Sequence, residues 1–193
     1  MRQLSGSDAF FLYSDKPGQH QHISTIYLYE PSTAPGGKVD FLTILEHVRD
    51  RIGTSRIFRQ RLVDVPLNLD YPYWIHDKNF DLEFHVRHIA LPHPGDWRQF
   101  CILASRLHAR PVDLKRPVWE MYVIEGLDNV AWLPKGSFAV LEGPPGRDRR
   151  RDRRRFHSRP ARSGGHSGGR RNQASLVLGA GARIRAVAGD GVV

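Results

Sequence analysis

The sequence contains a single cysteine, Cys101, among its 193 residues. One thiol can form neither an internal disulfide nor a thiolate zinc cluster, so both kinds of stabilisation are excluded. No apolar run approaches the roughly 18 residues that a membrane-spanning helix requires. The first 16 residues lack the basic and then apolar layout of a secretory signal. We therefore expect a cytoplasmic protein that is not secreted.

Residues 142–193 contain no lysine, and Phe156 is their only aromatic residue. They carry 13 arginines against 4 acidic residues, whereas residues 1–141 are neutral with 16 basic and 16 acidic side chains. Because the net charge of +9 belongs to the tail, a basic nucleic-acid-binding surface is excluded for the main part of the chain. The few apolar side chains of residues 142–193 cannot bury enough surface to offset the entropy that is lost when a chain becomes ordered. We therefore predict that this tail is disordered, with one short strand over 174–178 as the alternative.

Residues 1–141 show the pattern of a mixed α/β domain. Strands are predicted over 22–29, 83–91, 119–124 and 137–141, where β-branched and aromatic residues gather between turn residues. Helices are predicted over 8–14, with Phe10, Phe11 and Leu12 on the apolar side, over 41–52 after Asp40, and over 97–110. Asp96 and Gln99 form a capping box at the start of the last helix. This order indicates an α/β or α+β fold whose sheets are covered on one side by helices.

Three histidines, His85, His88 and His93, form the densest group of candidate metal ligands. Residues three apart on a strand face opposite sides, so His85 and His88 would need a bulge to reach one ion. His20 and His22 could share a strand face, but the sequence offers no third ligand near them. We therefore favour packing roles for these histidines and predict neither a metal site nor a bound cofactor.

Signatures of nucleophilic catalysis and of phosphate binding are missing from residues 1–141. This part has no Gly-x-Ser-x-Gly nucleophile elbow. The pair Gly36-Gly37 lacks the Lys-Ser or Lys-Thr and the helix of a phosphate-binding loop. Cys101 lies in the apolar part of a predicted helix, where a thiol usually packs as a small hydrophobic group.

The segment Arg116-Pro117-Val118-Trp119-Glu120 combines a cation, a rigid kink, an indole and an acid. Asp113, Glu120 and Glu125 are candidate carboxylates for acid–base chemistry, although an ion pair with Lys115 or Arg116 is the commoner role of such residues. We interpret the segment as a structural corner that holds the following strand in place.

Several blocks of the sequence occur together and in order over about residues 2–141. The most specific are Leu91-Pro92-His93-Pro94-Gly95 and the segment 116–120 with its continuation Ile124-Glu125-Gly126-Leu127; the others cover residues 4–12, 21–31, 58–62, 74 and 79–88. In this order the blocks resemble the bacterial wax ester synthase/diacylglycerol acyltransferase family, in particular its actinobacterial triacylglycerol synthases. The resemblance implies family-motif positions, of structural importance, at Arg116, Pro117, Trp119, Glu120, Glu125 and Gly126.

The resemblance implies an acyl-CoA-dependent O-acyltransferase with two similar α/β halves around a tunnel, as in chloramphenicol acetyltransferase and condensation domains. Its substrates would be acyl-CoA and a diacylglycerol or long-chain alcohol, met at the inner membrane or at lipid inclusions. In the family, a strand resembling 137–141 leads into the motif His-His-x-x-x-Asp-Gly. The second histidine is taken as the general base that removes a proton from the acceptor hydroxyl.

In this chain residues 142–150 follow that strand instead, and the 193 residues contain no adjacent pair of histidines. The codons of residues 142–150 can be compared with the motif in a reading frame shifted by one nucleotide, if arginine is taken to be encoded by CGN. In the shifted frame they permit the first His, the Asp and the Gly of the motif. They do not permit the second His. We therefore interpret residues 1–141 as the N-terminal half-domain of an acyltransferase and residues 142–193 as a tail that arises from a frameshift.

We expect such a chain to contain no catalytic residue of its own and to be inactive alone. A half-domain without its other half should also expose an apolar face larger than the few hundred Å² that is usual for monomers. The alternatives are a non-catalytic relic that binds lipid or a partner protein, and a nucleic-acid binder that acts through the arginine tail. Because the tail contains no lysine, we do not expect a nucleic-acid partner.

Overall fold

A computed structural model describes residues 1–16, 20–21, 23–143 and 185–186 of the chain. The predicted disordered tail, with its alternative strand over 174–178, therefore lies outside the described residues except at 142–143 and 185–186. His22 lies outside them as well.

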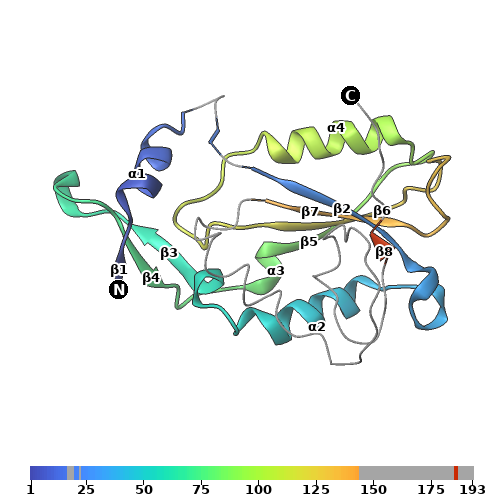
Figure 1. Cartoon of the computed structure of the whole chain (residues 1–193), viewed down its shortest axis with the longest axis horizontal. Helices are drawn as coiled ribbons and strands as arrows, with labels where there is room; N and C mark the ends of the chain where they lie inside the picture. The colour runs from blue at the N-terminus through green and yellow to red at the C-terminus, as the bar shows by residue number, and fades with distance from the viewer. Residues whose placement is uncertain (17–19, 22, 144–184, 187–193) are drawn as a thin grey trace, which may run out of the picture.

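Two β-sheets form the described part of the chain (Figure 1). The larger sheet has the order β5 (Val86–Ala90), β6 (Met121–Glu125), β7 (Phe138–Glu142), β2 (Thr25–Glu30) and β8 (Arg185–Ala186). Strands β5 and β6 are parallel and the other neighbours are antiparallel, which confirms the predicted mixed sheet. The smaller, antiparallel sheet has the order β1 (Arg2–Gln3), β4 (Tyr73–His76) and β3 (Gln60–Val63).

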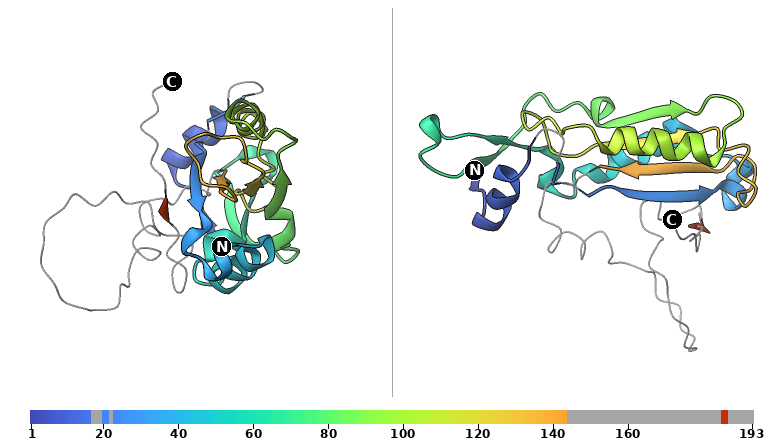
Figure 2. Two further views of the ribbon diagram at one scale, coloured as in Figure 1. Left: turned by 90° about the vertical axis from the view of Figure 1, so that its right-hand side faces the viewer. Right: turned by 90° about the horizontal axis from the view of Figure 1, so that it is seen from above.

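Helices cover the larger sheet on both faces, so the expectation of helices on one side was wrong. Figures 1 and 2 show α4 (Trp97–His108) along one face and α2 (Phe41–Ile52) along the other. Successive residues of a strand point to opposite faces, so each layer takes alternate side chains of the central strands. Val123 lies in the apolar cluster that contains Ile44 of α2, whereas Ile124 lies in the cluster that contains Phe100 of α4.

The starts of the two long helices differ in how they are capped. At α4 the predicted capping box is present, because Gln99 N donates to Asp96 Oδ1 at 2.7 Å and Asp96 N donates to Gln99 Oε1 at 3.1 Å. At α2, Asp40 occupies the N-cap position without a side-chain hydrogen bond to the helix, and Gly53 follows the last turn as predicted.

Two predicted elements differ from the structure in a way that matters for the site. The strand predicted over 83–91 begins as a one-turn helix, α3 (Leu82–His85), and becomes β5 only at Val86. The first helix is present as α1 (Gly6–Tyr13), but it buries Ala9 and leaves Phe10 and Phe11 exposed. Of the predicted apolar side, only Leu12 packs against a core cluster, whereas Phe10 and Phe11 are exposed.

Short elements complete the fold. Strands β1, β3 and β4 were not predicted. In the described ranges, single turns of 3-10 helix lie at Pro31–Thr33 and Arg56–Arg59, and the short turns Pro35–Gly37 and Pro66–Asn68 each contain a residue with left-handed backbone, Gly36 and Leu67. In the described ranges the longest helices, α2 and α4, have 12 residues each, and no helix there is long and apolar enough to cross a membrane.

Candidate functional site

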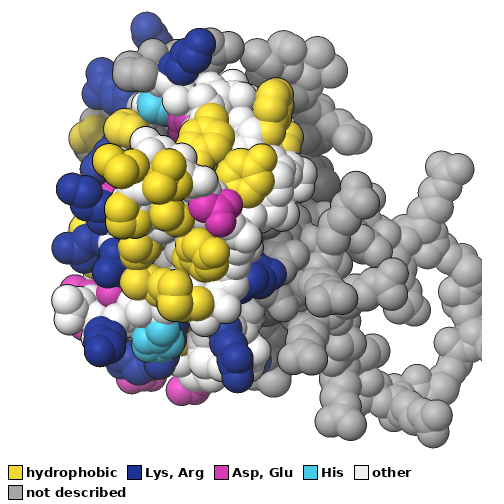
Figure 3. Space-filling view, turned by 90° about the vertical axis from the view of Figure 1, so that its left-hand side faces the viewer, with side chains coloured by type: hydrophobic (Ala, Val, Ile, Leu, Met, Phe, Trp, Pro, Cys, Tyr) yellow, Lys and Arg dark blue, Asp and Glu magenta, His cyan; other side chains and the backbone are white. Residues whose placement is uncertain are grey.

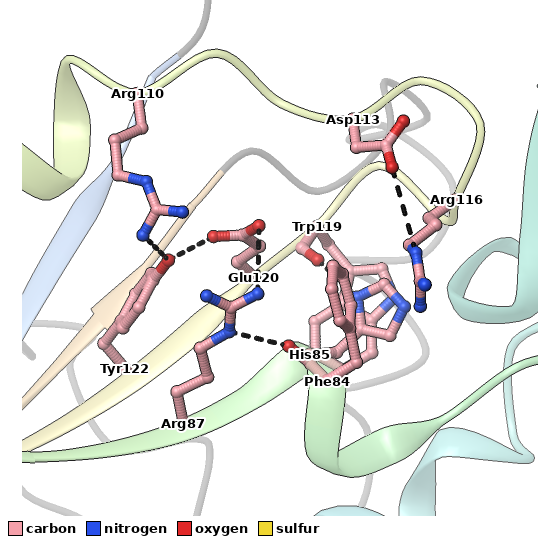
Figure 4. Close-up of polar contacts among 9 residues, drawn as sticks. All are labelled: Phe84, His85, Arg87, Arg110, Asp113, Arg116, Trp119, Glu120 and Tyr122. Carbon is pink, nitrogen blue, oxygen red and sulfur yellow. Dashed lines mark hydrogen bonds and ion pairs between the residues drawn. The ribbon is translucent and has the colours of Figure 1, made fainter.

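Residues 116–120 form a buried corner, here called the 116–120 corner, through which the chain enters β6 (Figure 4). Pro117 is fully buried and Trp119 is 6% exposed. Val118 packs against the cluster of the smaller sheet, which contains Trp74, while Trp119 belongs to the cluster beneath α2. The corner therefore joins the cores of the two sheets, as expected for a structural corner.

Aromatic rings hold the indole of Trp119 in place. Its Nε1 donates a hydrogen bond to the carbonyl oxygen of Phe58 at 2.9 Å, and the ring of Phe58 meets the indole edge-on with centroids 5.6 Å apart. The rings of His85 and Phe80 are stacked on the indole, at centroid distances of 4.7 and 6.4 Å. Since the one polar atom of the indole is satisfied, the side chain can remain in the apolar core.

His85 links the α3 turn to the corner through a hydrogen bond. Its Nδ1 lies 2.7 Å from the carbonyl oxygen of Trp119, and because a carbonyl only accepts, Nδ1 is the donor. Burial lowers the pKa of His85, so the ring is neutral near pH 7 with its proton on Nδ1. Only 1% of His85 is exposed, so a substrate cannot reach the imidazole. The ring instead helps to position the 116–120 corner.

The carboxylate of Glu120 is held by groups from two neighbouring segments. The Tyr122 hydroxyl donates to Oε2, and Arg87 Nη2 of β5 lies 4.0 Å from Oε1. Arg110, in the segment after α4, donates to the Tyr122 hydroxyl at 3.4 Å. Burial, together with the nearby Glu120 carboxylate, raises the pKa of Tyr122 to about 12. The Glu120 carboxylate therefore has a structural role, in which it binds the Tyr122 hydroxyl and the Arg87 guanidinium.

Two guanidinium groups pack against the ring of Phe84 (Figure 4). The Cζ of Arg116 lies 3.9 Å from the ring centroid and the Cζ of Arg87 lies 4.7 Å from it. Arg87 Nε also donates to the Phe84 carbonyl oxygen at 2.9 Å, and Arg116 Nε lies 3.8 Å from Asp113 Oδ2. The expected pairing of Asp113 with Arg116 is thus confirmed, whereas Glu120 pairs with Arg87 instead of Lys115 or Arg116.

The corner also fixes the place where the chain leaves β7. Gly143 N donates to the carbonyl oxygen of Glu120 at 2.7 Å, and a Cβ at residue 143 would lie 3.3 Å from that oxygen. Burial raises the pKa of the preceding residue, Glu142, to about 7. Residue 143 is the last described residue before 144–184, which lie outside the described residues.

The remaining two motif positions lie at the other end of β6. Glu125 Oε2 is 3.0 Å from His88 Nε2, and Leu91 N donates to the Glu125 carbonyl oxygen at 2.9 Å. Gly126 adopts a φ of 82°. The structure therefore brings Arg116, Pro117, Trp119 and Glu120 together and places Glu125 and Gly126 apart from them.

Other candidates from the sequence do not assemble into a reactive centre. Cys101 is half-buried on α4, and burial raises the pKa of its thiol. His20 Nδ1 lies 2.9 Å from Asp15 Oδ1. Within the described ranges, no group of three or more histidine, cysteine and acidic side chains is arranged to hold a metal ion.

Sequence reasoning favoured a packing role for His85 but missed the other residues that hold the corner, above all Phe58, Phe80, Phe84 and Arg87. They lie in the blocks 58–62 and 79–88, which carry part of the resemblance, so their signal was present without a role attached to it. The contact of His85 with Trp119 depends on the one-turn helix α3, which the strand-like composition of 83–91 concealed.

Comparison with known proteins gives a family match and named relatives. A family model described as the wax ester synthase/diacylglycerol acyltransferase catalytic domain matches residues 4–148. A Mycobacterium tuberculosis protein named as a diacylglycerol O-acyltransferase is 39% identical over 151 residues, which are 76% of this chain and 30% of that protein. A second, named tgs3, is 36% identical over 143 residues, covering 73% of this chain and 52% of that protein. The chain thus spans about a third to a half of these relatives.

Solved structures agree with the sequence relatives. The wax ester synthase/diacylglycerol acyltransferase of Marinobacter aquaeolei superimposes with a TM-score of 0.61 at 31% identity, over 75% of this chain and 33% of that one. The tallysomycin biosynthesis protein TlmII, at 15% identity and a TM-score of 0.54, shares the fold over the same fractions. The fold predicted from the resemblance is confirmed over the part that these structures cover. The chain belongs to the wax ester synthase/diacylglycerol acyltransferase family.

Proposed function

We propose that this chain is the N-terminal half-domain of an acyl-CoA-dependent O-acyltransferase that serves triacylglycerol synthesis, with diacylglycerol as the acceptor and a long-chain alcohol as the alternative. The observation that carries the proposal is the bond from Gly143 N to the Glu120 carbonyl oxygen. It attaches the end of β7, which the family resemblance places directly before the catalytic motif, to the family's 116–120 corner. Membership of the family supports the reaction class.

In this proposal the corner positions the end of β7, and its residues perform no chemical step. His85 is buried and donates its proton to a backbone oxygen, and Glu120 is engaged by Tyr122 and Arg87. A general base must reach the hydroxyl whose proton it removes, and neither group is free to do so. Since the 193 residues contain no adjacent histidine pair, we propose that the chain alone does not catalyse acyl transfer at a measurable rate.

An acyl-transfer assay with the purified chain tests this proposal. Radiolabelled palmitoyl-CoA and dioleoylglycerol in mixed micelles are incubated with the chain, and triacylglycerol and free coenzyme A are measured; we expect the level of a protein-free blank. Binding of palmitoyl-CoA is measured in parallel by calorimetry, and we expect saturable binding. Robust formation of triacylglycerol would overturn the proposed inactivity, and the absence of saturable binding would overturn the proposed substrate class.

A further inference from the structure

We propose that residues 182–188 of the tail act as an intramolecular edge strand, which pairs along the outer edge of β2 and closes the larger sheet against pairing with another chain. The outer edge is the side of β2 that faces away from β7. The pairing uses backbone groups and is independent of acyl transfer.

The structure places part of this segment on the outer edge. Strand β8 lies antiparallel to β2, with Ala186 opposite Tyr29 and Arg185 opposite Glu30. Figures 1 and 2 show β8 next to β2, outside the other strands of the larger sheet. The composition of the tail gives it no core of its own, so the position of β8 depends on the strand that it joins.

The register shows in which direction this pairing can lengthen. At one end β2 is followed by Pro31, which would face residue 184; proline has no amide hydrogen to donate, and here it begins a turn of 3-10 helix. In the other direction, residues 27–28 of β2 would face residues 187–188. Gly189 follows them, and glycine weakens a strand. The pairing can therefore extend only into β2, over two further residues.

The tail sequence suits an edge strand at this place. Residues 182–188 read Ala-Arg-Ile-Arg-Ala-Val-Ala and contain neither proline nor glycine. Arginines and apolar residues alternate over the first five positions, which is the two-residue period of a strand with one apolar side.

Charge also favours this partner for β2. The register sets an arginine position of the tail opposite Glu30, and opposite charges at facing positions favour antiparallel pairing. Ser32 Oγ donates a hydrogen bond to Glu30 Oε1 at 2.6 Å, which holds the carboxylate at this end of β2.

Strand β2 lacks the features that usually protect an edge strand. Its sequence, Thr-Ile-Tyr-Leu-Tyr-Glu, contains no lysine, proline or glycine, and it pairs with β7 without a bulge from Thr25 to Tyr29. Strand β5, at the opposite edge of the sheet, carries Arg87. A regular strand rich in β-branched and aromatic residues is a template for a strand of another chain, and a cover on its outer edge prevents such pairing.

The tail of the same chain is favoured over a second copy as the occupant. Thr25 faces Glu142 at the end of β7, so the chain leaves the sheet roughly 17 Å, one length of β2, from Glu30. Residues 144–184 are more than enough to cover that distance. A tethered segment competes at an effective concentration that separate molecules in dilute solution do not reach.

Hydrogen exchange of the full 193-residue chain, followed by mass spectrometry, tests the proposal. In Arg185→Pro/Ala186→Pro, both positions lose the amide hydrogen through which a strand pairs. We expect the outward amides of β2 to exchange on the order of tenfold faster than in wild type, and those of β5 to exchange as in wild type.

The matched control is Ala161→Pro/Arg162→Pro, which replaces the same two residue types elsewhere in the tail and should leave exchange from β2 unchanged. Unchanged exchange from β2 in Arg185→Pro/Ala186→Pro, or the same acceleration in the control, would overturn the proposal.

A nitroxide label locates the segment without weakening the pairing. In a Cys101→Ser background the label is attached at Ala188→Cys, or at Ala161→Cys as the control, and the line widths of the β2 amides are measured. The label at 188 should broaden the β2 resonances, and the label at 161 should not. No broadening from position 188 would contradict the proposal. Broadening in a mixture of nitroxide-labelled chain with ¹⁵N-labelled, nitroxide-free chain would also contradict it, because the occupant would then be a second copy.

Self-association measures whether the segment protects the edge. By sedimentation velocity, Arg185→Pro/Ala186→Pro should self-associate more strongly than wild type. Hydrophobic side chains gathered in a band at the end formed by α1 and the β3–β4 connection offer a second route to association (Figure 3). Phe10→Ser, at a residue of α1 that is 67% exposed, is therefore combined with the proline variant. The increase should persist; its loss with Phe10→Ser, or no increase at all, would refute the protective role.

Discussion

At the residue scale, Glu142 is a carboxyl group whose ionisation the fold changes strongly. Burial raises its pKa from the ordinary 4.5 to about 7, so the folded chain binds this proton more tightly than the unfolded chain. The stabilising contribution is therefore complete below about pH 4.5 and is lost as the pH rises through about 7. His85, whose pKa is lowered, has the opposite effect, because stability increases as its unfolded form loses a proton.

A comparison with Glu142→Gln separates the two effects. The free energy of unfolding of wild type minus that of the variant should fall by on the order of 2 kcal/mol between pH 4.5 and pH 7.5. Urea unfolding followed by tryptophan fluorescence at several pH values measures it. A difference that stays constant with pH would contradict the raised pKa.

At the element scale, the start of α4 depends on a backbone contact that only glycine permits. A Cβ on Gly95 would lie 1.9 Å from the carbonyl oxygen of Gly126, the residue that follows β6. Gly95→Ala should therefore destabilise the protein by about 3 kcal/mol or more, since backbone must move to admit the methyl group. Gly36 is the matched control, because it has a similar φ of 71° and nothing within 4 Å of an added Cβ.

Gly36→Ala should cost only about 1 kcal/mol, the strain of a left-handed alanine. Chemical unfolding of both variants gives the comparison. Equal costs would show that the approach of Gly95 to Gly126 does not constrain the fold.

The elements that sequence patterns predicted well are those with strong local signals. The 3.6-residue period of α2 and α4 and the Asp96–Gln99 capping box depend on neighbours in the sequence, and both helices are present. Strands β3 and β4 have four residues each, too few to show a period. The site at Trp119 could be predicted only as a corner, because its partners come from residues 58–85 and meet through tertiary packing. The exposure of Phe10 is likewise decided by what α1 packs against.

At the scale of the whole molecule, the two sheets differ in how completely they are buried. Residues Met121–Ile124 of β6 and Phe138–Leu141 of β7 are buried between helices, whereas every residue of β3 is only partly buried. Amides of β6 and β7 should therefore exchange with solvent only through global unfolding, and those of β3 through smaller openings at lower free energy.

Native-state hydrogen exchange measured with increasing urea tests this expectation. Exchange from β6 should depend steeply on urea, as global unfolding does, and exchange from β3 weakly at low urea. Equal protection of both sheets would mean that the small sheet and α1 unfold together with the large one.

The order of strands has a consequence for synthesis on the ribosome. Strand β7 is late in the described body, yet it lies between β6 and β2 in the finished sheet. Until Phe138–Glu142 emerge from the exit tunnel, β2 and β6 each keep a free edge of unpaired amides and carbonyls. Such edges pair readily with other chains. We therefore expect nascent chains to need protection by a chaperone until β7 has paired with both β6 and β2.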